Sequence, residues 1–525
     1  MAFNFIRSDS DQVFLLPPNT RDWLPEDHLT WEIIKVVDTL DLSAFLASYR
    51  ADGQGRPAYH PKVLVALVTY CYCKGIRSSR AIEGACFDDV GCRVITGNRH
   101  ADHATIARFV RRHAAALKRL FVQVLAVCAA DGLVRVDLVA GDGTKVKANA
   151  SKATNRTVEQ LDVRIEELEA VLAAEVAAWF AQAAAADAAE DALFARDGDD
   201  PDDGRTPPAG SAAARKRTAD QLARAKAAKD LLAQRHGDTA GKRTALGEAT
   251  ARAQAARARL ERVTASQQAK LDRDRQRHEV KAAGGRARAG RPPRPMEQAP
   301  RVLAARHALD KAERALRRAE ADPHKGAVPT ANPTDPASRV MPAKTGGYLQ
   351  GYNAQALATT DQVILAIGTH DNPTDVGACH PLLRQARANL DAAGITDTIG
   401  KALFDAGYAA TENFTTPTEA CLYVAVHNET AQTGRGDATD KTIPAGWQDM
   451  AARMATDEAK QLYRQRPAII EPVFAQLFAR LGRHLNYRGG MVDIELNLWG
   501  LTHNLLKRIR HIAKQATSSP APALT

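Results

Sequence analysis

The sequence predicts an α/β core that is preceded by an all-helical domain and interrupted by a long helical insertion. Apolar residues recur at helical spacing through most of residues 1–130. Short strand-like apolar segments alternate with an amphipathic helix in residues 340–430, and an earlier segment of the same type, LVRVDLVAGD, lies at 133–142. Alanine and charged residues dominate residues 155–325, which is typical of long helices with charged faces, such as a coiled-coil pair. The predicted parts are an N-terminal helical domain (1–130), the first part of the core (131–154), the insertion (155–339), the second part of the core (340–514) and a flexible tail (515–525).

The length of the chain bounds the number of its domains, and its net charge indicates the class of its partner. A chain of 525 residues is too long for one ordinary core, so two or three domains are expected. The hydrophobic share of 45% and the charged share of 25% are those of a soluble globular protein. A net charge of +10 and a pI of about 9.2 fit a polyanionic partner such as nucleic acid, although they say nothing about the fold.

The cysteines and the N-terminus suggest a compartment. The chain has 7 cysteines, an odd number, and none of them form a Cys-x2-Cys pair. A disulfide framework or a structural zinc site is therefore not expected. The start, MAFNFIRSDSDQ, lacks the apolar segment of a signal peptide, and no uncharged run reaches the roughly 18 residues that span a bilayer. We expect a cytoplasmic protein that does not enter a membrane.

The N-terminal domain has the pattern of a DNA-binding module. After a proline-rich arm at 14–25, helices are predicted at 25–49, 60–76, 78–88 and 103–132. Pro61 suits the first turn of the second helix and Gly75 suits its end. The last helix carries Arg108, Arg111 and Arg112, and short helices with basic residues suggest a helix-turn-helix-like fold. A helical bundle with a solvated basic face explains the same pattern equally well.

The core is predicted from its strands. The segment 133–142 ends in a turn, GDGTKVKANASK, that contains Lys145 and Lys147. Residues 347–370 read as a hairpin around Thr360-Asp361. The remaining elements are an amphipathic helix at 380–395, strands within 399–408 and 421–426, and helices at 465–485 and 491–514.

Acidic residues lie at comparable points of this layout. Asp142 and Asp405 each end an apolar strand, and Glu471 lies at a predicted helix start, with Pro472 in the first turn. Carboxylates that converge in this way are the oxygen ligands that magnesium-type ions require. Two such ions activate the attacking oxygen and stabilise the leaving oxygen during displacement at phosphorus. Alternatively, Glu471 is only a favourable charge at a helix N-terminus.

Three segments resemble the catalytic segments of the DDE transposases of bacterial insertion sequences, of the IS4/IS5-like superfamily. They are GDGTKVKANAS around Asp142, FDAGYAATENF around Asp405, and YRQRPAIIEPVFAQLFARLG around Glu471. GYNAQ (351–355), NYRGG (486–490), LWGLTHNLLK and the N-terminal helices resemble the same family. The resemblance covers residues 13–155 and 340–512, with the motifs in order, and agrees with members that carry an insertion between the two aspartates.

The resemblance implies a fold, a metal site and partners. The core would be a ribonuclease H-like α/β fold in which Asp142, Asp405 and Glu471 bind two Mg²⁺ (or Mn²⁺) ions. Tyr463 and Arg466 would contact DNA near the scissile phosphate. The partners would be the terminal repeats of a transposon and its target DNA, with a homodimer handling two ends together.

One position departs from the family pattern. Phe478 lies seven residues after Glu471, where the family has a lysine, and an arginine does not replace a lysine in reach or geometry. The spacing between the arginine and the glutamate also differs by one residue. Lys145 and Lys147 would touch phosphates, or form a solvated pair. The predicted DNA-binding residues are Tyr463, Arg466, Lys145, Lys147, Arg480, Arg483, Arg111 and Arg112.

The sequence therefore predicts a transposase that cleaves insertion-sequence ends and transfers them to target DNA. The alternative is a catalytically inactive DNA-binding protein derived from a transposase, which the missing lysine favours. A structural coiled-coil protein would account for residues 155–325 but not for the ordered motifs on both sides of them.

Overall fold

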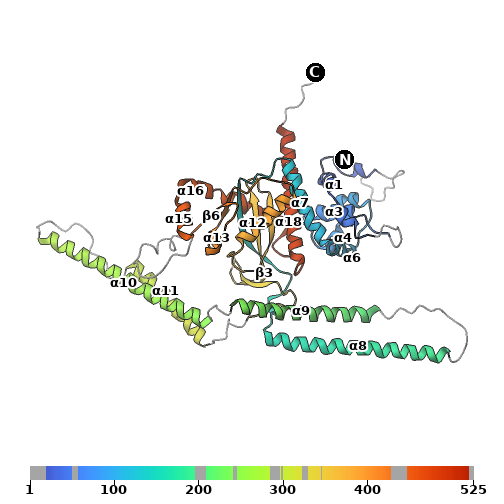
Figure 1. Cartoon of the computed structure of the whole chain (residues 1–525), viewed down its shortest axis with the longest axis horizontal. Helices are drawn as coiled ribbons and strands as arrows, with labels where there is room; N and C mark the ends of the chain where they lie inside the picture. The colour runs from blue at the N-terminus through green and yellow to red at the C-terminus, as the bar shows by residue number, and fades with distance from the viewer. Residues whose placement is uncertain are drawn as a thin grey trace, which may run out of the picture. The chain divides into compact units, whose positions relative to one another are not determined.

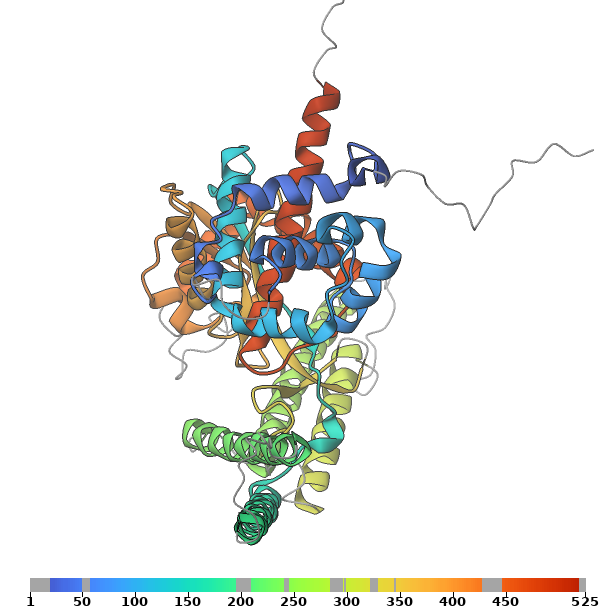
Figure 2. The ribbon, with the colours of Figure 1, turned by 90° about the vertical axis from the view of Figure 1, so that its right-hand side faces the viewer.

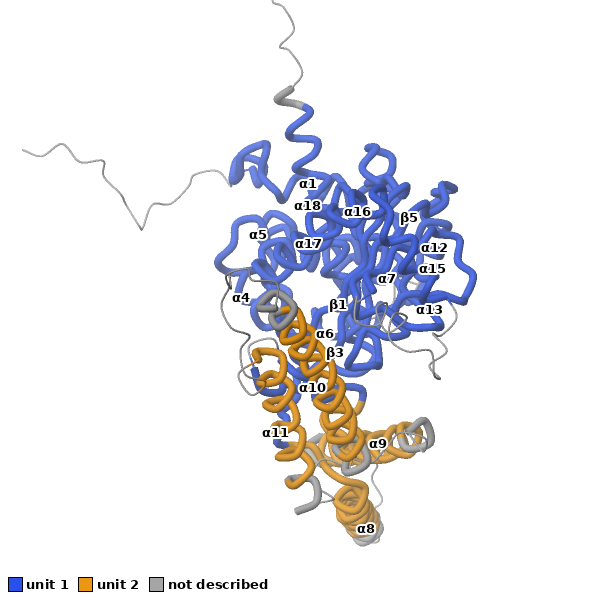
Figure 3. The backbone as a smooth tube through the Cα atoms, turned by 90° about the vertical axis from the view of Figure 1, so that its left-hand side faces the viewer, with its two compact units in different colours: residues 1–153, 337–525 blue, residues 154–336 orange. Residues whose placement is uncertain are grey.

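The structure, a computed structural model, describes residues 19–49, 57–194, 209–239, 245–283, 296, 299–321, 329–343, 346–426 and 446–518. It divides into two compact units, shown in different colours in Figure 3. Unit 1 comprises residues 1–153 and 337–525, and unit 2 comprises 154–336. The predicted N-terminal domain and, apart from Thr154, both parts of the predicted core thus fall in unit 1. Residues 14–18 of the predicted arm and 519–525 of the predicted tail lie outside the described residues.

The N-terminal helices follow capping signals in the sequence. Pro61 occupies the first turn of α3, where its missing N–H costs no hydrogen bond, and Gly75 takes a φ of +82° just after the helix ends. Asp89 caps a short helix, α5, that the sequence did not predict, by accepting from the backbone N of Cys92. The described elements are the 3-10 turn η1 (Thr20–Trp23) and the helices α1 (Leu29–Thr39), α2 (Ser43–Leu46), α3 (Pro61–Cys73), α4 (Ser79–Asp88), α5 (Val90–Thr96), α6 (His103–Arg112) and α7 (Ala114–Ala130).

The helix predicted at 103–132 is divided in two. α6 and α7 meet at His113 with a bend of 76°. The His113 ring is buried, with its centroid 4.7 Å from that of Phe109 and 5.1 Å from that of Phe45, so the break turns an imidazole into the apolar core. Helical periodicity runs through the break, which is why sequence alone predicted one helix. Of the helices described, no single one is long and apolar enough to cross a membrane, and α6 and α7 reach that length and composition only as a bent pair.

A mixed sheet forms the centre of unit 1 (Figure 1). Its strands run in the order β2-β3-β1-β5-β6, and β4 also pairs with β3. β3 pairs antiparallel with β1, β2 and β4, whereas β5 pairs parallel with β1 and β6. The strands are β1 (Leu138–Lys147), β2 (Arg339–Pro342), β3 (Tyr348–Thr359), β4 (Ile364–His370), β5 (Lys401–Phe404) and β6 (Cys421–Val424).

The first strand extends further than predicted. β1 continues through Lys147, so the segment expected to be a turn is part of the strand, and Asp142 lies at its middle rather than its end. The cause is long-range pairing: β1 is bonded along its length to β3, from Val139 opposite Thr359 to Lys147 opposite Gly351. Two glycines within GDG suggested a turn locally, but a partner strand two hundred residues away decides the structure.

Helices cover the sheet. α12 (Cys379–Ala392) packs on β3 and β4, and α17 (Arg466–Leu481) packs on β1 and β3. α18 (Met491–Ser518) packs between β4 and α7, and Figure 2 shows it in red among the blue N-terminal helices. Gly500 allows this approach, because a Cβ there would lie 2.9 Å from both Ile367 and Phe121. The smaller helical elements are the 3-10 turn η4 (Ala406–Tyr408) and the helices α13 (Thr411–Thr415), α15 (Trp447–Ala455) and α16 (Asp457–Tyr463).

Glu471 lies inside its helix and not at the helix start where it was predicted. α17 starts at Arg466 with Pro467 in its first turn, so Glu471 is its sixth residue and Pro472 lies inside the helix. A proline there cannot donate to the carbonyl four residues before it, which is that of Ala468. Gln362 from the β3–β4 hairpin donates its side-chain amide to that carbonyl instead, at 3.0 Å. Because this long-range bond satisfies the carbonyl of Ala468, the helix accommodates a proline in its interior, although local sequence rules place proline at a helix start.

Unit 2 consists of paired helices and includes most of the predicted insertion. α8 (Val158–Phe194) packs against α9 (Ala209–Thr239), and α10 (Ala245–Ala283) packs against α11 (Pro300–Ala321). Leu161, Ala228 and Leu232 form a small buried cluster in the first pair. Exposed ion pairs such as Lys229–Asp162, at 2.5 Å, link its charged faces. The first pair of helices thus packs through small apolar residues and exposes its charged faces to solvent, as the composition predicted.

Candidate active site

Strand register places Asp142 beside Asp405. Ala140 of β1 is opposite Leu403 of the parallel strand β5. Asp142 lies two residues after Ala140, and Asp405 lies two residues after Leu403. Neighbouring strands are about 4.8 Å apart, and residues two apart share a face. The two carboxylates therefore lie close together, Asp142 within β1 and Asp405 directly after the end of β5.

A buried arginine faces both carboxylates. Nη1 of Arg466 lies 3.6 Å from Oδ2 of Asp142, and Nη2 lies 3.4 Å from Oδ2 of Asp405. The arginine is only 8% exposed, and its Nη1 makes no hydrogen bond. Burial lowers the pKa of Arg466, but Asp142, a hydrogen bond to Tyr463 and Asp405 raise it, and the net shift is upward. One cation thus serves two carboxylates at ion-pair rather than hydrogen-bond distance.

Burial makes the ionised form of the Asp142 side chain unfavourable. Burial raises the pKa of Asp142 to about 6, Arg466 opposes that shift, and the nearby charges of Asp405 and Asp375 add to it. A carboxylate that is buried beside other acids needs more positive charge than one guanidinium supplies. Strongly perturbed acids of this kind occur at functional sites.

Glycines on both sides of Asp142 make room for the site. A Cβ on Gly141 would lie 2.2 Å from the ring of Phe404, and a Cβ on Gly143 would lie 2.2 Å from Oδ1 of Asp375. The GDG motif is therefore needed for close approach to the strand rather than for a turn.

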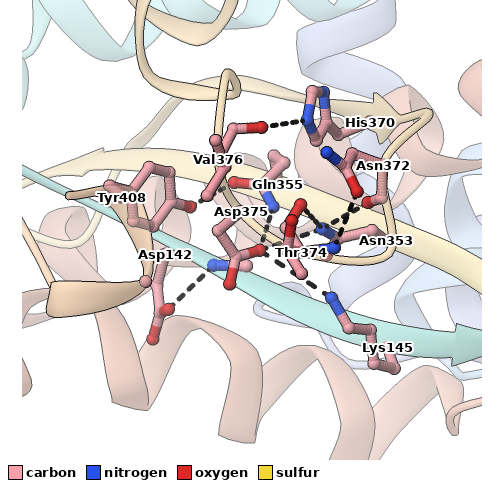
Figure 4. A network of polar contacts seen from close by, with 12 residues as sticks. Asp142, Lys145, Asn353, Gln355, His370, Asn372, Thr374, Asp375, Val376 and Tyr408 are labelled. Carbon is pink, nitrogen blue, oxygen red and sulfur yellow. Dashed lines mark hydrogen bonds and ion pairs between the residues drawn. The ribbon is translucent and has the colours of Figure 1, made fainter. Parts of the chain in front are cut away.

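A third aspartate lies at this site, and the sequence did not point to it. Oδ1 of Asp375, in the loop after β4, accepts from Nδ2 of Asn353 at 2.9 Å and from Nε2 of Gln355 at 2.8 Å (Figure 4). Lys145 lies 3.8 Å from the same oxygen. The available signal was in β3, where Asn353 and Gln355 place amides on one face of an otherwise apolar strand and so require a polar partner.

Tyr408 closes the network. Its hydroxyl donates to Oε1 of Gln355, and it is buried beneath the site. Burial raises the pKa of Tyr408 well above its ordinary value, and the charges of Asp375, Asp142 and Asp405 raise it further. The tyrosine therefore stays protonated and acts as a fixed donor.

Glu471 lies on the same helix as Arg466 but is not joined to the aspartates in this structure. It is exposed, and among the described residues it has no hydrogen-bond or ion-pair partner. Glu471 follows Arg466 by five positions, which corresponds to about 7.5 Å along the helix axis. No group of three or more His, Cys, Asp or Glu side chains within the described ranges is arranged to hold a metal ion.

The other predicted DNA-binding residues divide into near and distant ones. Tyr463 ends α16 next to Arg466, and Lys145 lies against Asp375. Arg480 instead donates to the carbonyl of Cys73 at the end of α3. The guanidinium of Arg483 stacks 4.1 Å from the centre of the Phe478 ring. Lys147 is exposed at the end of β1, where its backbone N donates to the carbonyl of Arg483 at 2.8 Å.

Arginines also gather in the N-terminal helices. An open hollow of about 660 Å³ lies between α4 and α6, and its lining includes Arg80, Arg108, Arg111 and Arg112. Arg112 donates to the carbonyl of Ser48. Among the described residues, Arg80, Arg108 and Arg111 have no ion-pair or hydrogen-bond partner. The hollow therefore presents unneutralised positive charge to solvent.

Helical N-terminal elements and a mixed sheet with an acidic pair thus define unit 1. Residues 18–112 match the family model described as Transposase domain (DUF772). No curated protein and no solved structure matches the chain. The matched residues contain α1 to α6, including the arginine-lined hollow, and they support a transposase, a DNA-processing enzyme in the general sense.

Proposed function

We propose that this chain is a DDE-type transposase, which cleaves insertion-sequence ends and joins them to target DNA through Asp142, Asp405 and Glu471. One observation carries the proposal: one buried guanidinium faces both Asp142, in the middle of β1, and Asp405, which directly follows the neighbouring parallel strand β5. Carboxylates grouped in this way around a single positive charge suit hard divalent cations. The transposase domain at residues 18–112 supports the same class of enzyme.

We also propose that the core of unit 1 is ribonuclease H-like. The support is the sheet order, in which an antiparallel meander of β1, β3 and β4 continues on the other side of β1 into the parallel strands β5 and β6. The acidic pair lies where the first strand meets the first parallel strand.

The acidic residues fit Mg²⁺ or Mn²⁺. Asp142 is buried with a raised pKa, so a nearby cation would favour its charged form. Asp142 and Asp405 would hold the metal with oxygen donors alone, and Glu471 has an exposed carboxylate without a protein partner in the described part of the chain. A pair of bound ions supplies Lewis acidity at the attacking and leaving oxygens of a phosphodiester.

The surrounding side chains bind and orient DNA. Water would add to the scissile phosphorus while the bond from phosphorus to the 3′-oxygen breaks, which leaves a 3′-hydroxyl and a 5′-phosphate. The freed 3′-hydroxyl would later attack a phosphorus of the target, lose its proton and displace the target's own 3′-oxygen, which leaves as a hydroxyl. Arg466, Tyr463 and Lys145 lie next to the acidic pair and would bind the phosphates on either side of the break. Arg111 and Arg112 would bind the DNA backbone further away. Two ends have to be joined together, which favours a homodimer.

A cleavage assay tests this proposal. The substrate is DNA with the terminal sequences that flank the gene, with and without Mg²⁺. Asp142→Ala, Asp405→Ala and Glu471→Ala should each abolish cleavage and leave DNA binding within about twofold. Asp371→Ala is the matched control, because Asp371 is an exposed acid near the site without a partner in the described chain. Cleavage at the parental rate by any of the three variants contradicts the assignment of that residue.

A second function is favoured by one observation, the packing of Phe478. Its ring stacks on Phe474, with centroids 5.9 Å apart, and under the guanidinium of Arg483, so no lysine amine is presented there. The second candidate is a DNA-binding protein that does not cut. Binding of the terminal DNA without Mg²⁺-dependent breaks would favour it over the enzyme.

A further inference from the structure

Both aspartates of the acidic pair are oriented by glycine N–H groups. Oδ1 of Asp142 accepts from the backbone N of Gly143 at 2.8 Å, and Oδ1 of Asp405 accepts from the backbone N of Gly407 at 2.9 Å. In each aspartate the other oxygen, Oδ2, then faces Arg466. The direction in which Oδ2 of each aspartate points therefore depends on the position of the glycine whose N–H binds Oδ1.

A single side chain lies against both glycines. A Cβ on Gly143 would be 2.2 Å from Oδ1 of Asp375, and a Cβ on Gly407 would be 3.2 Å from Oδ2 of the same residue. One carboxylate thus fills the space between β1 and the turn after β5. A Cβ at Gly143 would force Asp375 or Gln355 to move, and a Cβ at Gly407 would make a tight contact with Asp375 and Asp405.

Asp375 is itself held firmly. Asn353, which is fully buried, donates from one amide nitrogen to Oδ1 of Asp375 and to the carbonyls of Asn372 and Thr374, at 2.9–3.2 Å. Gln355 donates to Oδ1 as well, and His370 bonds to the carbonyl of Val376 at 3.0 Å (Figure 4). The loop is therefore anchored to the neighbouring strand β3, and Asp375 does not depend on solvent for its position.

We propose that Asp375 is a positioning residue: braced by Asn353 and Gln355, it sets the places of Gly143 and Gly407 and thereby the spacing of the Asp142 and Asp405 carboxylates. The inference rests on the proposed function, since it assigns the pair to metal binding. Asp375 acts through its shape and its two accepted hydrogen bonds, and the metal is held by the other two aspartates.

Mn²⁺ binding to the full chain, measured by electron paramagnetic resonance and calorimetry, tests the inference without relying on activity. Asp375→Ala removes the brace and should weaken Mn²⁺ binding at least tenfold. Asp375→Asn keeps the size and the acceptor oxygen and should stay within threefold of the parent. Asp371→Ala, which removes an exposed acid of the same loop, should bind as the parent does.

The opposite outcomes are distinct. Parental Mn²⁺ affinity in Asp375→Ala, together with lost affinity in Asp142→Ala, would overturn the inference and leave the proposed function standing. Equal losses in the Asn and Ala variants would overturn it in favour of direct binding by the Asp375 charge. Parental affinity in Asp142→Ala would overturn the proposed metal site and this inference with it.

A second variant covers the case in which the alanine variant does not fold. Asp375→Glu keeps the charge and both acceptor oxygens but is one methylene longer than the space beside Gly143 allows. Positioning requires at least a tenfold loss of Mn²⁺ affinity in this variant too. Parental affinity would show that the length of the side chain is irrelevant and would overturn the inference.

Discussion

Replacing Asp142 by asparagine should stabilise unit 1 while removing the proposed activity. Burial raises the pKa of Asp142 from 3.8 to about 6. In the unfolded chain the group ionises at its ordinary pKa, so above pH 6 the folded chain holds a carboxylate at a cost of about 3 kcal/mol, at ~1.4 kcal/mol per pH unit. Asparagine keeps the acceptor for the N–H of Gly143 and carries no charge. The loss of attraction to Arg466 is already contained in the net pKa shift.

The sign of the pH dependence follows from the direction of that shift. Between pH 3.8 and 6 the folded chain binds more protons at Asp142 than the unfolded chain does, so stability from this group falls as the pH rises. It is fully present below 3.8 and lost above about 6. The gain from Asp142→Asn should therefore be about 3 kcal/mol at pH 7.5 and about half of that at pH 5.

Urea unfolding in EDTA measures this difference. Trp179 is the one tryptophan of unit 2, so Trp179→Phe in both proteins confines the fluorescence signal to unit 1. Asp371→Asn is the control and should change the free energy of unfolding by less than about 0.5 kcal/mol. An asparagine variant that is less stable than its parent at pH 7.5, or that gains equally at both pH values, would refute the reasoning.

Further changes test the surroundings of the acidic pair and the DNA surface. Arg466→Met leaves two carboxylates without their cation and should destabilise unit 1 by about 3–5 kcal/mol at pH 7.5 and by less at pH 5, as urea unfolding would show. Gly143→Ala should cost at least about 2 kcal/mol because its Cβ meets side chains at 2.2–2.3 Å. Gly84→Ala, with nothing within 4 Å in α4, should gain about 0.5–1 kcal/mol in the same assay. Arg108→Ala should reduce the salt dependence of DNA binding by about one phosphate contact, whereas Arg384→Ala on α12 should not; equal slopes in fluorescence anisotropy would exclude a DNA role for the hollow.

Local sequence signals predicted the elements whose cause is local. The hairpin around Thr360-Asp361, the amphipathic helix α12 and the start of α3 at Pro61 all follow from turn residues, periodicity and capping. The place of Asp405 directly after a short strand also followed from an apolar run. These features depend on a few neighbouring residues, so one sequence is enough to predict them.

Features that depend on distant partners could not be predicted in the same way. β1 extends through GDGTKVK only because β3 pairs with it, and α6 ends at His113 because aromatic rings far apart in sequence surround it. Asp375 has no motif of its own and matters only because β3 presents amides to it. Arg466 was predicted to contact DNA, and the structure places it against the acidic pair, a role that needs the packed helix to be seen.

The carbonyl that Pro472 leaves without a helical donor links α17 to the β3–β4 hairpin, and this link can be measured. Pro472 leaves the carbonyl of Ala468 without its helical donor, and Gln362 fills that place at 3.0 Å. Gln362→Ala should lose about 0.5–1.5 kcal/mol through this bond, and loss of the bonds that Oε1 of Gln362 accepts from Lys507 and Gln476 adds to it. In a Pro472→Ala background the new N–H of residue 472 donates to the same carbonyl, so the loss should shrink.

A double-mutant cycle isolates the shared bond, since the bonds of Gln362 with Lys507 and Gln476 occur in both backgrounds and cancel. The coupling free energy from urea unfolding should be about 0.5–1.5 kcal/mol. Additivity within about 0.3 kcal/mol would mean that the carbonyl of Ala468 is equally well satisfied by water. Because that carbonyl lies between Arg466 and Glu471, a measured coupling would also show that the turn bearing both side chains is held from the hairpin and not by its own helix alone.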